Sequence, residues 1–306
     1  MIDIRSLFHK VCIAINRRRF DRKLQGILDT NPIHLGNTPL TLLSMVHHRD
    51  VLSYLLAAKS FARFIVPAKV VIVADPSITP ADRELLKRHI PEVCFRNAAE
   101  FHCQELPKGG TWERLTAIAE YAQERFVIQL DADTVATKAM PEVELAIREN
   151  HAFLLGTEDV QQIQPVVQIA TWAKGRLAGD DHVQLVAESV LDGLSDQSRW
   201  KYVRACSGFA GFPRGAFGKE QLVRISQEMS ALLGERWKEW GTEQFTSNLV
   251  LASMEGAKLL PHPKYCAPHR ANGDTAFRHF IGYVRHTTPL YAILAGQVAA
   301  ELRSGG

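Results

Sequence analysis

Short hydrophobic runs without polar alternation recur through the first half of the chain, and amphipathic stretches separate them. Runs of this kind are typical of strands that helices cover on both faces of a parallel sheet. The alternation of the two patterns predicts an α/β fold. The predicted strands are Leu40–Val46, Lys69–Ala74, Val93–Arg96, Phe126–Leu130 and Ala152–Leu155, and the predicted helices are Val51–Phe64, Pro80–His89, Thr111–Glu124 and Met140–Asn150.

The second half of the chain is less regular, and its loops are rich in Gly, His and Arg. It contains no internal repeat and no clear boundary between independent domains, so we expect one large domain. Helices are predicted here at His182–Leu191, Lys219–Leu233, Thr242–Glu255 and Pro289–Arg303.

Two carboxylates, Asp131 and Asp133, follow the strand Phe126–Leu130 directly. Ligands of open parallel sheets bind at the carboxyl ends of the strands, and in extended backbone the two side chains would point to the same side. Carboxylate oxygens suit a divalent cation such as Mg²⁺, which commonly also binds substrate phosphates. The alternative is that these residues cap the next helix or form a turn. The motif alone leaves both interpretations open.

Composition indicates a soluble globular protein. Of the 306 residues 46% are hydrophobic, which is enough for a large core, yet no stretch is long and apolar enough to span a membrane. We expect a cytoplasmic protein, because the N-terminus lacks the features of a secretory signal and the five cysteines are scattered without a Cys-x-x-Cys pair. The 36 basic and 33 acidic residues give a net charge of +3, which argues for no nucleic-acid partner.

Residues 1–28 predict a basic helix, because seven lysines and arginines stand against two aspartates. Apolar residues on this helix allow two interpretations. It packs on the domain with its charged side in solvent, or it makes a peripheral contact with a membrane, with the arginines near anionic head groups.

A glycine turn at Gly109-Gly110 opens the predicted helix that Thr111 would cap. Arg114 lies off the centre of the apolar face of this helix, so its guanidinium would reach the end of the following strand. A guanidinium there suits bidentate contact with phosphate. The alternative is an exposed helix arginine.

Near the C-terminal end, His279, Gly282 and Arg285 follow one another at three-residue steps, which a helix or a wrapped loop would align on one side. An imidazole can join carboxylates on Mn²⁺, and an arginine can neutralise the charge of a leaving phosphate. A glycine lets the backbone approach a ligand closely.

Two further segments, 206–214 and 240–248, combine small residues with polar groups that can hydrogen-bond a sugar. In the second segment Thr242 is a candidate helix cap, and Glu243 would favour the helix dipole. That role is a sufficient structural explanation for Glu243. Asn248 would share a helix face with Gln244.

In this order the motifs resemble the A-type glycosyltransferases, most closely the glycogenin and bacterial lipopolysaccharide galactosyltransferase family. The likeness covers roughly residues 40–288. It implies a Rossmann-like, mixed and mostly parallel sheet flanked by helices. We expect three parts: a basic N-terminal helical extension at 1–37, a glycosyltransferase catalytic domain at 38–288 and a C-terminal helix at 289–306. The catalytic domain would consist of a nucleotide-binding half at 38–155 and an acceptor and metal half at 156–288.

The resemblance implies that Asp131, Asp133 and His279 hold Mn²⁺ (or Mg²⁺). Arg114 would bind the donor, and Gly282 and Arg285 would close over its diphosphate. The remaining candidates are Gln244, Ser207 and Gly208 at the reactive face of the sugar, Glu243 at the donor hydroxyls, and Met45, His47 and Asp75 at the nucleotide base.

The sequence departs from the family at two places. The family usually has Lys where Arg285 stands, and Asp-Gln where this chain has Glu243-Gln244; the charge is kept, but the geometry need not be. Asp75 also fits an ordinary turn.

The expected activity is transfer of a sugar from a nucleotide-diphosphate donor, a UDP-sugar, to a hydroxyl of a carbohydrate or glycolipid acceptor. By the resemblance the anomeric configuration is retained, and Gln244, Glu243 and Arg285 are the catalytic candidates. One alternative is a nucleotidyltransferase acting on sugar phosphates. That function would not explain the spacing of His279, Gly282 and Arg285. The other is a nucleotide-sugar-binding protein without turnover.

Overall fold

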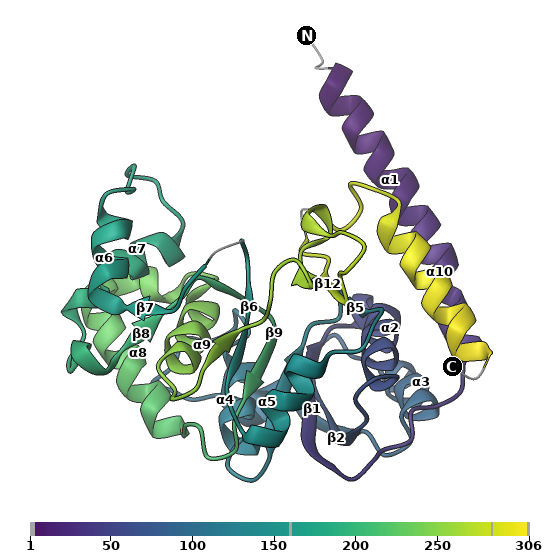
Figure 1. Cartoon of the computed structure of the whole chain (residues 1–306), viewed down its shortest axis with the longest axis horizontal. Coiled ribbons are helices and arrows are strands. Elements are labelled where there is room, and N and C mark those ends of the chain that lie inside the picture. Colours follow the sequence, from purple (N-terminus) through teal and green to yellow (C-terminus); the bar gives the residue numbers. More distant parts are fainter. Residues whose placement is uncertain (1–3, 159–160, 283, 305–306) are drawn as a thin grey trace.

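The computed structural model describes residues 4–158, 161–282 and 284–304 (Figure 1). Its main sheet has seven strands in the order β10-β6-β9-β4-β1-β2-β3. Within this sheet β9 is antiparallel to both of its neighbours, β4 and β6, and the other pairs are parallel. The strands are β1 (Thr38–Val46), β2 (Pro67–Ala74), β3 (Cys94–Asn97), β4 (Phe126–Leu130), β6 (Phe153–Gly156), β9 (Ala205–Phe212) and β10 (Lys258–Leu259).

Both faces of the sheet are buried, which is why its strands read as continuous apolar runs. On β1, Leu42 packs into the hydrophobic cluster on one face and Leu43 into the cluster on the other. The first cluster includes side chains of α2 (Val51–Ala62), α3 (Pro80–His89), α5 (Pro141–Glu149) and α10 (Leu290–Arg303). The second includes α4 (Trp112–Tyr121), α6 (Val166–Lys174), α7 (Val183–Ser189), α8 (Lys219–Leu233) and α9 (Thr242–Ala252).

The remaining described strands form two small sheets. One is formed by β11 (Tyr265–Cys266), β12 (Phe277–His279) and β5 (Thr134–Ala136), and the other by β7 (Gln164–Pro165) and β8 (Lys201–Tyr202). In the first of these, β12 runs antiparallel to β5 and brings the C-terminal part of the chain back to the end of β4.

The predicted mixed, mostly parallel sheet flanked by helices is confirmed, and each of the five predicted strands is present. Among the described elements, the short strands β5, β7, β8, β10 and β11 were not predicted, and three other elements also differ from expectation. β9 was not predicted as a strand, because its alanine, serine and glycines hide the alternation. α6 was also not predicted. His279 ends the strand β12, whereas a helix or a loop was expected.

The basic helix α1 (Ile4–Leu24) lies along α10 at one side of the molecule, and its N-terminal part extends beyond the rest of the chain (Figure 1). The rings of Phe20 and Tyr291 stack with their centroids 3.9 Å apart. The amide of Asn16 donates to the carbonyl of His286 at 3.0 Å. The C-terminal part of α1 therefore packs on the domain, as the first of the two interpretations predicted. Among the described helices, none has the length and apolar content to span a bilayer.

A buried lysine of α2 holds the segment that follows α1. Lys59 is 1% exposed, and its Nζ donates to Thr30 Oγ1 at 2.8 Å and to the carbonyls of Thr30 and Asn31 at 3.3 and 2.5 Å. Burial lowers the pKa of Lys59 to about 8, because the charged ammonium is poorly solvated there.

We therefore expect Lys59 to make folding more favourable as pH rises from 8 to 9.5. Over this range the unfolded chain, whose lysine has the ordinary pKa of 10.5, binds a proton that the folded chain has released. Urea unfolding at pH 7.5 and 9.5 should show the free energy of unfolding of the parent rising relative to Lys59→Met. The expected difference is about 1 kcal/mol after allowance for solvent screening. Identical pH responses of the two proteins would contradict this assignment.

Candidate metal and donor site

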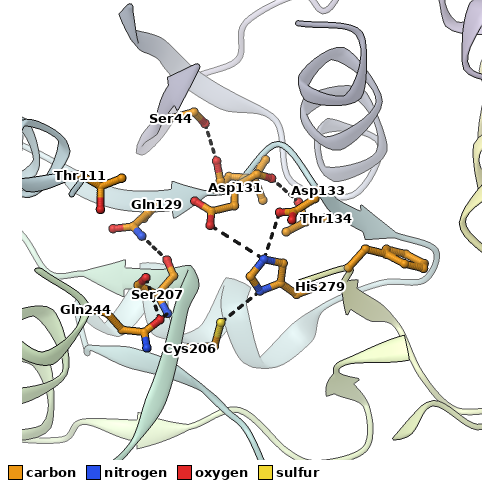
Figure 2. A network of polar contacts seen from close by, with 12 residues as sticks. Ser44, Thr111, Gln129, Asp131, Asp133, Thr134, Cys206, Ser207, Gln244 and His279 are labelled. Atoms are coloured by element: carbon orange, nitrogen blue, oxygen red, sulfur yellow. Dashed lines mark hydrogen bonds and ion pairs between the residues drawn. The ribbon is translucent and has the colours of Figure 1, made fainter. Parts of the chain in front are cut away.

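Three metal-ligating side chains converge at the carboxyl end of β4. Asp131 and Asp133 lie in the turn between β4 and β5, and the pairing of β5 with β12 sets His279 opposite Thr134. His279 Nε2 is 3.0 Å from Asp133 Oδ1 and 3.9 Å from Asp131 Oδ2 (Figure 2). One ligand atom from each of the three residues lies within 4.8 Å of the others. Neither aspartate caps α5, whose N-cap residue is Met140.

Gly208, one of the two glycines of β9, makes room for this imidazole. A Cβ at Gly208 would lie 2.0 Å from His279 Cε1, a distance that no real contact shows. Gly208 also accepts a hydrogen bond from the backbone N–H of Asp131 at 2.9 Å. Gly208 therefore permits the close approach of His279 and fixes the start of the aspartate turn.

Cys206 lies on the other side of the imidazole and was not predicted as a site residue. Its Sγ is 3.2 Å from His279 Nδ1, so that Nε2 is left to face the two carboxylates. Residues two apart on a strand share a face, which places Cys206 beside Gly208. Recognition of β9 as a strand would have pointed to Cys206.

Two arginines neutralise the aspartates. Arg114 of α4 is 4% exposed, with Nη1 2.5 Å from Asp131 Oδ1 and Nη2 3.2 Å from Glu243 Oε2, so the alternative of an exposed helix arginine is wrong. Arg285 pairs with Asp133 and lies 3.6 Å from Asp50, which sequence reasoning did not single out.

The charges of these partners set the ionisation of the site. Burial raises the pKa of Asp133, but the charges and hydrogen bonds of His279 and Arg285 outweigh it and lower the pKa to about 2. Burial lowers the pKa of His279, but Cys206 and Asp133 raise it well above its ordinary value. Burial raises the pKa of Glu243, and Arg114 offsets only part of this. Two carboxylates and one imidazole are a donor set that fits Mn²⁺.

A second polar group lies between β9 and α9. Gln244 Oε1 accepts from the backbone N–H and the hydroxyl of Ser207, both at 3.1 Å, and its Nε2 donates to Gln184 Oε1 at 3.1 Å. Asn248 donates to the carbonyl of Ala205 at 2.8 Å, so it shares a helix face with Gln244 as predicted. Gln184 of α7 was missed, since no motif marks it.

Thr111 is the N-cap residue of α4, as predicted, but its φ is 74° and its side chain makes no capping hydrogen bond. The predicted cap Thr242 is wrong, because the N-cap residue of α9 is Gly241, with a φ of 111°. Thr111 instead donates to Glu243 Oε2 at 2.9 Å. Thr242 accepts from the indole of Trp112 at 3.0 Å. Tertiary partners have replaced the local capping bonds.

The remaining candidates lie at the ends of β1 and β2 and in the loop after β12. His47 Nδ1 is 3.2 Å from Asp75 Oδ2, and Met45 lies in β1 two residues before His47. Asp75 also accepts from the backbone N–H of Ser77 at 2.8 Å, which is the turn that was the alternative. Gly282 lies with Arg285 beside a cavity of about 830 Å³.

No protein-family model and no curated protein sequence matches this chain. Among solved structures, an active-site mutant of LgtC superposes with a TM-score of 0.53 at 12% identity, over 85% of this chain and 95% of that one. This chain has the fold of LgtC. The expected A-type glycosyltransferase fold is thereby confirmed.

Two other solved structures are similar at lower scores. The galactosyltransferase LgtC with donor and acceptor sugar analogues gives a TM-score of 0.45 at 12% identity, over 85% of this chain and 95% of that one. The Mn/GDP form of core-mannan synthase A from Aspergillus fumigatus gives 0.44 at 11% identity, over 89% and 87%.

We expect Gly208→Ala to weaken Mn²⁺ binding at least 10-fold, because the new methyl group displaces a ligand from its position. Titration of Mn²⁺ followed by electron paramagnetic resonance measures the affinity. Gly282→Ala is the matched control, since a Cβ there meets no atom within 4 Å. Unchanged Mn²⁺ affinity in a folded Gly208→Ala protein would show that His279 is not a ligand.

Proposed function

We propose that this protein is a metal-dependent glycosyltransferase that moves a sugar from a nucleotide-diphosphate donor, a UDP-sugar, to a hydroxyl acceptor with retention of configuration. The observation that carries the proposal is the convergence of Asp131, Asp133 and His279 between two arginines, at the carboxyl end of a central strand. Mn²⁺ held by these three residues would offset the charge of the departing diphosphate. The fold shared with LgtC supports this assignment.

Other side chains of the site are proposed to bind the phosphates and the base of the donor. Arg285 lies at the edge of the carboxylate pair and is 29% exposed, so its guanidinium is placed to bind phosphate oxygens and stabilise the leaving group. Arg114 is held between Asp131 and Glu243, and it orients both carboxylates. His47, Asp75 and the end of β1 are proposed to contact the base.

Gln244 is the proposed residue at the reactive face of the sugar. Its amide is held at both ends, since Ser207 donates to the oxygen and Gln184 accepts from the nitrogen. A fixed amide dipole stabilises developing charge without reorganising during the reaction. Glu243 is proposed to bind donor hydroxyls from its buried position next to Thr111.

Incubation with radiolabelled UDP-sugars and Mn²⁺ tests the proposal. Release of UDP and of labelled sugar or glycoside supports glycosyl transfer. In a parallel incubation with UTP, a sugar 1-phosphate and Mn²⁺, release of pyrophosphate would instead identify the nucleotidyltransferase. Tight binding of UDP-sugar without any product would identify the non-catalytic binding protein.

Asp133→Ala should abolish Mn²⁺-dependent donor turnover and leave the far-ultraviolet circular dichroism spectrum unchanged. The substitution removes a metal ligand and leaves Arg285 its second partner, Asp50. Asp274→Ala, on an exposed loop, is the control and should retain the parent rate. Parental Mn²⁺ binding and turnover in Asp133→Ala would rule out the metal assignment.

We also propose that the exposed side of α1 makes a peripheral contact with an anionic membrane surface in the cytoplasm. Val11 and Ile15 are 47% and 43% exposed, and Arg18 and Arg22 follow on the same helix face. The five cysteines are all free thiols, which supports a reducing compartment.

Co-sedimentation with vesicles that contain about 30% phosphatidylserine should recover the parent but not the double variant Val11→Asp, Ile15→Asp, since anionic head groups attract the arginines and the apolar side chains enter the interface. Vesicles of phosphatidylcholine alone are the lipid control. Equal recovery of the parent with both vesicle types would rule out the proposed contact with an anionic membrane surface.

A further inference from the structure

A cavity of about 570 Å³ opens beside β6 and β9, away from the metal ligands. Its volume lies in the range of small-molecule sites. Figure 1 shows the elements around it, α6, α7, β7 and β8, gathered at the opposite side of the molecule from α1 and α10. The wall includes an aromatic ring, several amides and an ion pair, from Gln161, Gln162, Gln164, Trp172, Glu188 and Arg204.

The cavity lies at the same end of the sheet as the metal ligands. Gly208 accepts a hydrogen bond from the backbone N–H of Asp131, and Arg204, on the cavity wall, directly precedes the first residue of β9. The side chains of Gln184, Tyr202 and Glu188 lie between Gln244 and Arg204. A molecule that reacts beside Gln244 and reaches Arg204 must therefore extend beyond a single sugar.

A continuous chain of hydrogen bonds joins the cavity wall to Gln244. From Gln244 it passes to Gln184, whose Nε2 donates to Tyr202 at 3.2 Å, and Tyr202 donates to Glu188 at 3.0 Å. Arg204 Nε donates to the same Glu188 oxygen at 2.9 Å. Gln184 and Glu188 are one turn of α7 apart, so a rigid helix connects the wall with the amide at the proposed reaction centre.

The wall chemistry matches a neutral saccharide. Trp172 is 41% exposed, and the guanidiniums of Arg176 and Arg204 lie over its ring, 4.3 and 5.2 Å from the centroid, so a sugar would contact the part of the indole that they leave uncovered. A pyranose ring presents an apolar C–H face that packs on an indole and hydroxyls that bond to amides. Within the described part of the chain, the amide groups of Gln162 and Gln164 make no hydrogen bond of their own, so they are available to such hydroxyls.

We propose that this cavity is a distal subsite for the acceptor, and that the acceptor is an oligosaccharide of two or more sugars. The terminal sugar lies beside Gln244, and a sugar further along packs on Trp172. The inference rests on the proposed glycosyltransferase function.

The test uses the full chain and a glycan array of immobilised gluco- and galacto-oligosaccharides of one to four units. The parent and Asp133→Ala should both bind at least one oligosaccharide, and Trp172→Ala should bind it at least 10-fold more weakly. Trp172→Phe should retain most of the binding, because an aromatic face remains. Gln221→Ala, which alters a glutamine beside a different cavity, should bind like the parent.

Donor hydrolysis separates this inference from the proposed function. UDP release from UDP-glucose or UDP-galactose without acceptor should be unchanged in Trp172→Ala and lost in Asp133→Ala. Absence of UDP release from the parent would count against the glycosyltransferase, whereas the array reports on the cavity alone. The subsite is overturned if the parent binds no oligosaccharide on the array, or if folded Trp172→Ala binds as tightly as the parent.

Discussion

Charge balance at Asp131 and Asp133 is the constraint on which the rest of the site depends. Two carboxylates that lie together in a largely buried place require compensating positive charge. Here Arg114 and Arg285 supply that charge from different elements, one from α4 and the other from the loop after β12. Each arginine also has a second anionic partner, Glu243 or Asp50. Each arginine therefore keeps one anionic partner when a metal cation replaces the arginine beside the aspartates.

The site is assembled by strand pairing more than by any single motif. The pairing of β12 with β5 fixes His279, and β9 supplies the glycine that lets the imidazole approach. Because β9 is antiparallel between β4 and β6, its first residues lie at the same end of the sheet as the last residues of those strands. Ser207 thereby meets Gln244 at the end of β4.

The sequence was sufficient for the fold class and for the residues that meet at the centre of the site. Hydrophobic runs such as Phe126–Leu130 identify buried strands without any tertiary information, and Asp131 and Asp133 follow from their place after one. The burial of Arg114 was not predictable, since its partner Glu243 lies 129 residues away and no local pattern reports it. The same partner binds the hydroxyl of Thr111, which is the N-cap residue of α4 but makes no side-chain capping bond. β9 was missed because small residues carry no strand signal: Gly208 is required by the close approach of His279, and Gly211 by the rings of Phe153 and Phe126.

The contact between α1 and α10 has a consequence for synthesis of the chain. Phe20 and Tyr291 are buried against each other, although 271 positions separate them in the sequence. At the usual rates of translation, about 15–50 s pass between the synthesis of one ring and the other. During that interval the inner side of α1 has no α10 to cover it, so each nascent chain carries an exposed aromatic surface. That surface is a natural target for a chaperone, and a site of aggregation where synthesis outpaces folding.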